Sequence, residues 1–181
     1  MRSLKNFSVD KTALLLFSAI SLLFFGIFYY HHLFQREQTQ LFELTTDYFL
    51  RSLSYQGGFA VYAGEFLTQF FRIPVLGAVI ITALLILLHH AAGSLINALW
   101  KTRAFCVIPW IPSLIYCVLL TRQFYYISGV IGLIIAVYAS GWYIKTGRFN
   151  YRIMKGMLLI PVLYWLTGGA FLVFTLNIVI T

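Results

Sequence analysis

Long apolar segments alternate along the chain with polar segments that carry most of the charge. An α-helix rises about 1.5 Å per residue, so about 20 apolar residues cross the ~30 Å hydrocarbon core of a bilayer. The pattern therefore predicts an all-α integral membrane protein, in which 1–181 form a single membrane domain with about five transmembrane helices. The predicted spans are 12–30, 73–90, 104–121, 125–144 and 157–180.

The polar segment 31–72 is much longer than the others. Successive residues of a helix are rotated by about 100°, so a helix over 36–54 would carry a polar stripe and an otherwise mostly apolar surface. A second helix over 59–71 would have Glu65 on its polar edge, and Gly57-Gly58 between the two can end a helix in the left-handed conformation. We therefore predict two short amphipathic helices along the membrane interface. The stripe of the first consists of Arg36, Gln40, Glu43, Asp47 and Arg51.

Four of the five acidic residues lie in this segment. Glu37 falls at the helical angle of the apolar side, and a carboxylate there is costly to desolvate and tends to be functional. The alternative is that the helix boundaries differ by a few residues, which leaves Glu37 in water. Asp47 faces solvent and can pair with Arg51 four residues further on. Together with Glu43, it therefore also fits a solvated, self-paired helix face.

The composition excludes an ordinary soluble domain, because 61% of the residues are hydrophobic and 10% are charged, against about 25% charged in soluble proteins. The net charge of +8 does not indicate nucleic-acid binding, because the basic residues are dispersed among the polar segments. Nine of the thirteen Lys and Arg residues fall in the first, third and fifth of these segments. The positive-inside rule therefore predicts a cytoplasmic N-terminus, with 31–72 outside. The expected location is a bacterial inner membrane.

Small residues recur every four positions in the fourth span, at Gly132, Ala136 and Ser140. Such a stripe lets a second helix approach closely, so it is a predicted helix-packing face. The expected partners are membrane lipid and a protein within the membrane. The sequence has no Ser-His-Asp set, phosphate loop or metal-spaced cluster, which indicates a membrane protein without a complete catalytic apparatus. The last span ends with the chain at Thr181, which suggests a truncated or split gene product or the first part of a longer protein, although some complete proteins also end this way.

Several short motifs in the first polar segment resemble the N-terminal part of a bacterial family of multi-pass membrane proteins of unknown function. The resemblance covers the first span, the polar segment and the start of the second span, about a third of the chain. It implies a fold but no activity, and members of that family are usually longer. The motifs are Glu37-Gln38-x-Gln40-Leu41-Phe42, Thr46-Asp47-Tyr48-Phe49, Gly57-Gly58-Phe59, Tyr62 and Glu65-Phe66-Leu67-x-Gln69-Phe70-Phe71.

The order of elements is also similar to the start of the GT-C glycosyltransferases, which use a polyprenyl-phosphate sugar donor. This likeness implies that Glu37 acts as base or metal ligand with Asp47 in support, and a divalent metal is expected only on this basis. Gln38 stands where these enzymes often have a second acid. Arginines would then hold the lipid phosphate, namely Arg36, Arg51 and Arg72.

Two interpretations follow. The chain is the front module of a GT-C-like protein that acts on lipid-linked substrates at the outer membrane face. Alternatively, it is a non-catalytic scaffold that docks partners through its amphipathic helices and its small-residue face.

Overall fold

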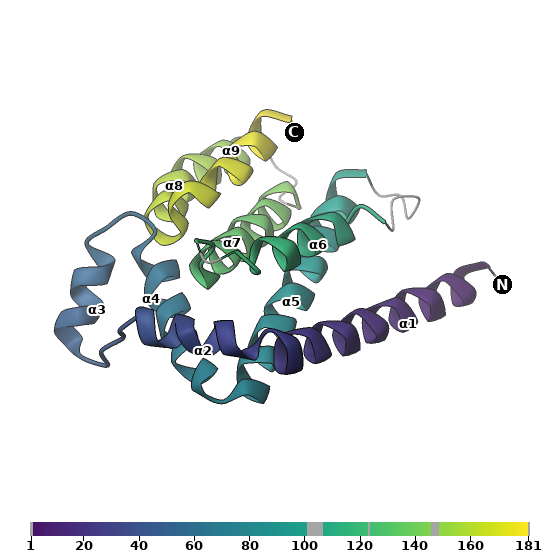
Figure 1. Cartoon of the computed structure of the whole chain (residues 1–181). Helices are drawn as coiled ribbons and strands as arrows, with labels where there is room; N and C mark the ends of the chain where they lie inside the picture. Colours follow the sequence, from purple (N-terminus) through teal and green to yellow (C-terminus); the bar gives the residue numbers. More distant parts are fainter. Residues whose placement is uncertain (1, 101–106, 123, 146–148, 181) are drawn as a thin grey trace.

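The computed structural model describes residues 2–100, 107–122, 124–145 and 149–180, and within these ranges the chain forms helices and turns without any strand (Figure 1). The elements in chain order are α1 (Arg2–Leu23), the π-helical η1 (Phe24–Phe28), α2 (Tyr30–Thr39), α3 (Thr46–Leu53), α4 (Gly58–Thr68), η2 (Gln69–Arg72), α5 (Pro74–Trp100), α6 (Trp110–Leu119), α7 (Ile127–Ile144), α8 (Phe149–Thr167), η4 (Gly168–Ala170) and α9 (Phe171–Ile180).

Helix α5 lies at the centre and packs against α1, α6 and α7. The largest core cluster consists of buried apolar side chains, and two buried polar side chains beside it have hydrogen-bond partners. Ser113 donates to the Leu85 carbonyl at 3.0 Å, and Thr82 donates to Ser21 at 3.1 Å. The buried members of the cluster include Phe25, Leu33, Phe71, Ile81, Leu85, Leu88, Leu120 and Val130.

Four stretches of the described residues are long and apolar enough to cross a membrane. The predicted span 104–121 is not among them, because α6 has only ten residues; 104–106 lie outside the described residues. Proline is least disruptive in the first turn of a helix, because further inside it removes a backbone hydrogen bond. Accordingly, Pro109 directly precedes α6 and Pro112 lies in its first turn, so the helix begins late in the apolar run. The four stretches are Lys11–Phe28, Val75–Trp100, Ile127–Ile144 and Ile153–Val179.

The predicted helix over 36–54 is wrong, because this segment forms two separate helices, α2 and α3. The side chain of Thr45 accepts a hydrogen bond from the Tyr48 amide at 3.2 Å and so caps the start of α3. This cap favours a new helix start over continuation of the preceding helix. The helical angles that placed Glu37 and Asp47 on one helix therefore do not apply across the break.

The predicted span 157–180 is divided between α8 and α9 in the structure, because the chain reverses after α8. Gly168 has φ +57°, a left-handed conformation that favours glycine. A Cβ on Gly156 would lie 3.6 Å from Ile178 Cδ1, and the rings of Tyr164 and Phe171 are 5.2 Å apart. Helix α9 therefore runs back along α8 as a helical hairpin (Figure 1).

Candidate functional site

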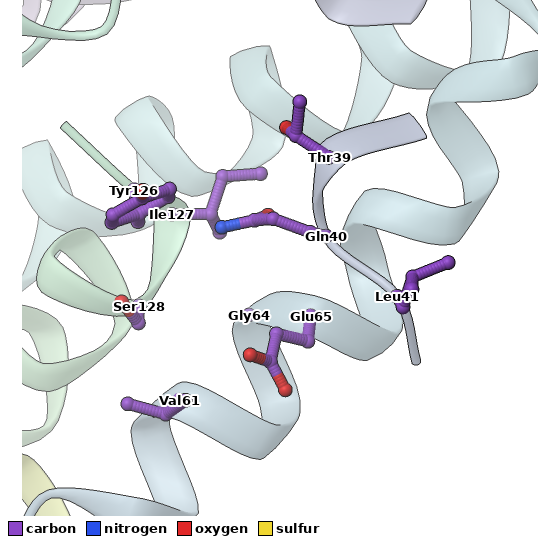
Figure 2. A pocket seen from close by; sticks show the side chains of 9 residues that line it. All are labelled: Thr39, Gln40, Leu41, Val61, Gly64, Glu65, Tyr126, Ile127 and Ser128. Carbon is purple, nitrogen blue, oxygen red and sulfur yellow. The ribbon is translucent and has the colours of Figure 1, made fainter. Parts of the chain in front are cut away.

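A pocket of about 480 Å³ lies where three segments distant in sequence come together (Figure 2). Its volume falls in the range of small-molecule sites. The lining residues are Thr39, Gln40 and Leu41 at the end of α2, Val61, Gly64 and Glu65 on α4, and Tyr126, Ile127 and Ser128 at the start of α7.

The wall between α4 and α7 is formed by backbone in direct contact. A Cβ on Gly64 would lie 2.8 Å from the Ser128 nitrogen and 3.0 Å from its Cα. Real Cβ atoms do not approach backbone this closely, so only glycine fits here. The α4 carbonyl at Gly64 also accepts a 2.8 Å hydrogen bond from the buried Thr68 hydroxyl. The close approach of α4 to the start of α7 therefore fixes the position of Glu65.

Glu65 is the acidic residue of the pocket. Its Oε2 atom accepts a hydrogen bond from the Tyr48 hydroxyl at 2.5 Å, and Figure 2 shows its carboxylate among the lining side chains. Burial and this hydrogen bond raise the pKa of Tyr48 to about 12. Tyr48 therefore remains a protonated donor at neutral pH and orients one oxygen of the carboxylate.

An aromatic cluster holds α3 against α4 and thereby places Tyr48 beside Glu65. Phe42, in the linker between α2 and α3, contacts Tyr48, Tyr62 and Phe66 at ring-centroid distances of 5.7, 5.0 and 5.6 Å. Edge-to-face contacts of this kind add to the area that the rings bury. The linker is fixed at its other end as well, because Gln69 donates to the Gln40 carbonyl at 2.9 Å.

The turn between α3 and α4 docks on the end of α8. The Gly57 amide donates to the Trp165 carbonyl at 2.8 Å, and the Trp165 indole donates to the Leu53 carbonyl at 2.7 Å. Tyr164 also donates to the side-chain oxygen of Gln56. The carbonyls near a helix end lack partners within the helix, so these bonds satisfy groups on both elements.

Arg36 holds the end of α6, which directly precedes the third segment of the pocket. The Nη2 atom of Arg36 donates to the Leu120 carbonyl at 2.8 Å and to the Arg122 carbonyl at 2.5 Å. The Tyr29 hydroxyl donates to the Thr121 carbonyl between them at 2.6 Å. A cation is favourable at the C-terminal end of a helix. Burial lowers the pKa of Arg36 from its ordinary value, yet a guanidinium stays charged in proteins.

A family model matches residues 5–181, which is nearly the whole chain. The chain belongs to DUF6057, a family of unknown function. Comparison of this DUF6057 chain with the curated proteins and with the solved structures found no match. The predicted membership of a family of unknown function is thus confirmed, and the match extends far beyond the first third of the chain.

In this DUF6057 protein the two acids predicted from the sequence do not line the pocket. Glu37 is half-buried on α2, and its side chain forms no hydrogen bond or ion pair with another described residue. Asp47 is exposed in the first turn of α3 and forms no ion pair with Arg51. Arg51 and Arg72 are both exposed.

The pocket acid, Glu65, was predicted only as part of a polar helix edge. Its pairing with Tyr48 depends on how α3 crosses α4, which periodicity does not encode. Both residues do belong to the motifs that carry the family resemblance, and this was the available signal. Within the described ranges, no three His, Cys, Asp or Glu side chains gather as a metal site would require.

The small residues of the predicted helix-packing face, Gly132, Ala136 and Ser140, are all buried on α7. A Cβ on Gly132 would lie 3.1 Å from the Thr167 carbonyl oxygen and 3.5 Å from the Ala170 Cβ. In this DUF6057 protein the face at Gly132 therefore lies against the turn between α8 and α9 of the same chain.

Proposed function

We propose that this protein is a multi-pass membrane protein that binds the hydroxyl-bearing head group of a lipid-linked substrate in the pocket between α2, α4 and α7. The observation that carries the proposal is the Glu65 carboxylate, which lines the pocket and is oriented by Tyr48. A concave site with a few convergent polar groups is where a ligand is expected to bind.

The apolar surface supports a membrane location. Leu15, Leu16 and Ile20 on α1 are all more than half exposed, as lipid-facing residues would be. The distribution of Lys and Arg supports an orientation with the N-terminus in the cytoplasm. With that orientation, the segment 31–72 and its pocket residues lie at the outer membrane face.

The chemistry of the lining favours hydroxyl groups as ligands. A carboxylate accepts hydrogen bonds, whereas the hydroxyls of Thr39 and Ser128 and the amide of Gln40 both donate and accept. Tyr48 is the described donor to the Glu65 carboxylate and bonds one of its two oxygens. The other oxygen is then free to accept from a sugar hydroxyl. A phosphate would be repelled by the same carboxylate, so the part of the lipid beyond the phosphate fits best.

This proposal retains lipid-linked substrates from the GT-C-like interpretation and changes the acidic residue from Glu37 to Glu65. A carboxylate beside a sugar hydroxyl is placed as a general base would be in a longer, complete enzyme. The scaffold alternative is less favoured, because the stripe of Gly132, Ala136 and Ser140 is buried within the chain.

The test measures lipid binding to the full chain in mild detergent by native mass spectrometry. The probes are farnesyl phosphate linked to glucose and farnesyl phosphate without the sugar. We expect the wild type to bind the glucosylated lipid about tenfold more tightly, as two or three sugar hydrogen bonds would allow. Glu65→Gln should remove this preference.

Glu43→Gln is the matched control, because it removes one negative charge from an exposed carboxylate in the linker between α2 and α3. It should leave the preference unchanged. Equal binding of the two lipids by the wild type, or an equal loss in both variants, would overturn the proposal.

A further inference from the structure

A second hollow, of about 310 Å³, lies between α1 and α6 and is almost entirely apolar. We call it the α1–α6 groove. Phe17, Ile20 and Phe24 line one side, and Cys117, Val118 and Thr121 line the other. It shares no lining residue with the Glu65 pocket.

The two helices that form the groove run in the same direction. Phe17 contacts Trp110 at a ring-centroid distance of 5.3 Å, and Tyr29 bonds the Thr121 carbonyl eleven residues beyond Trp110. At about 1.5 Å per residue, the stretch between these two contacts is roughly 17 Å long. That length is about the depth of one leaflet of a ~30 Å hydrocarbon core.

The groove is open to the surroundings of the protein. Only 11% of the residues in Lys11–Phe28 are buried, and Ile20 and Val118 on its two sides are 65% and 63% exposed. The helix α1 changes to the π-helical η1 at Phe24, beside the groove. π-Helical turns are rare in proteins overall, and those that occur are often found at functional sites.

Positive charge is concentrated at the Thr121 end of the groove. The Arg36 guanidinium lies across this end, bonded to the carbonyls on both sides of Thr121. Arg36 is 7% exposed, and its Nε and Nη1 atoms have no hydrogen-bond partner. Arg122 follows Thr121 directly, and its side chain forms no hydrogen bond or ion pair with the described residues. The groove lining contains no acidic residue.

We propose that the α1–α6 groove binds one acyl chain of an anionic phospholipid whose phosphate is held at Arg122, beside Arg36. An apolar channel one leaflet deep with arginines at one end complements a lipid tail joined to a phosphate. Arginine binds phosphate through charge-assisted hydrogen bonds. A second protein helix would match the apolar lining but would leave the two charges without a counter-ion. The site does not depend on Glu65 or on the function proposed for the pocket.

The test is a titration of the full chain with phosphatidylglycerol and with phosphatidylcholine, followed by native mass spectrometry. We expect one tightly bound phosphatidylglycerol, with phosphatidylcholine bound at least tenfold more weakly. Arg122→Gln should weaken phosphatidylglycerol binding about tenfold, which is the size expected for a lost charge-assisted contact. Val118→Trp should also weaken it, because the indole fills the groove from an exposed position.

Two controls keep the result specific. Arg51→Gln removes the same charge from exposed α3, and Glu65→Gln alters only the pocket. Both should bind phosphatidylglycerol like the wild type, so a failed pocket proposal would not affect this result. The inference is overturned if Arg51→Gln weakens binding as much as Arg122→Gln, or if Val118→Trp has no effect. It is also overturned if Val118→Trp converts a dimer to a monomer, because a second copy would then cover the groove.

Discussion

Gly57 and Gly168 face each other across two turns that are more than a hundred residues apart in the chain. Both have left-handed backbone, with φ +76° and +57°. A Cβ on Gly57 would lie 3.0 Å from both the Cα and the nitrogen of Gly168. The turn between α3 and α4 therefore packs backbone to backbone on the turn between α8 and α9. This contact anchors the segment that carries Tyr48 and Glu65 to the rest of the protein.

Replacing Gly168 with alanine should destabilise the protein. The substitution places a side chain in left-handed backbone and 3.3 Å from the Gly57 Cα, which costs about 1–3 kcal/mol. Thermal unfolding in mild detergent should show a lower Tm. The neighbouring variant Gly169→Ala is the control, because its Cβ meets nothing within 4 Å. Equal Tm values for the two variants would contradict the role of the contact.

Gly64→Ala should open the pocket. Its Cβ would lie 2.8 Å from the Ser128 nitrogen, so α4 must move away from the start of α7. We expect a lower Tm and loss of the preference for the glucosylated lipid. Gly129→Ala is the control in the same region, because its Cβ would lie at an ordinary contact distance of 3.7 Å from the Tyr116 hydroxyl. If both variants retained wild-type stability and binding, the described helix contact would be wrong.

Tyr48 should titrate at higher pH than an ordinary tyrosine, because its pKa is raised from 10.0 to about 12. A raised pKa means that folding favours the protonated phenol. The stabilisation is thus fully present below about pH 10 and is lost as the pH rises towards 12. Glu65→Gln should lower the midpoint, since the carboxylate contributes to the shift. The difference in tyrosinate absorbance between the wild type and Tyr48→Phe measures this titration, and a midpoint near 10 would refute it.

Arg36→Met should lower the stability of the protein even though methionine retains much of the apolar stem. The carbonyls of Leu120 and Arg122 would lose their charge-assisted donor, a loss of about 1.5–3 kcal/mol. Arg51→Met, at an exposed position of α3, should change the Tm little. Thermal unfolding compares the two variants, and an equal or higher Tm for Arg36→Met would show that Arg36 has no structural role.

The helical class of the fold follows from the apolar periodicity, but its breaks depend on local chemistry. The break before α3 arises from the Thr45 cap, which is a single hydrogen bond. The spacing of apolar residues gives little sign of such a cap. The reversal at Gly168 was signalled by the pair Gly168-Gly169, although the apolar run continues through it. In both places the hydrophobic pattern continues through a point at which a helix ends.

The candidate site was less predictable, because it is made by tertiary contacts. The GT-C likeness implied that Arg36 holds a lipid phosphate, whereas Arg36 is buried and bonds the end of α6. The pairing of Tyr48 with Glu65 depends on Phe42 packing between α3 and α4. Side-chain spacing along one helix does not specify such crossings between helices.

Photo-crosslinking tests the central claim most directly. The probe is farnesyl phosphate-linked glucose with a photoreactive group on the sugar, added to the full chain in lipid nanodiscs. Peptide mass spectrometry then locates the crosslinks. The proposed site predicts crosslinks at Leu41, Val61 and Tyr126, all lost in Glu65→Gln. Crosslinks confined to the surroundings of Glu37 or Asp47, and unchanged in Glu65→Gln, would contradict it.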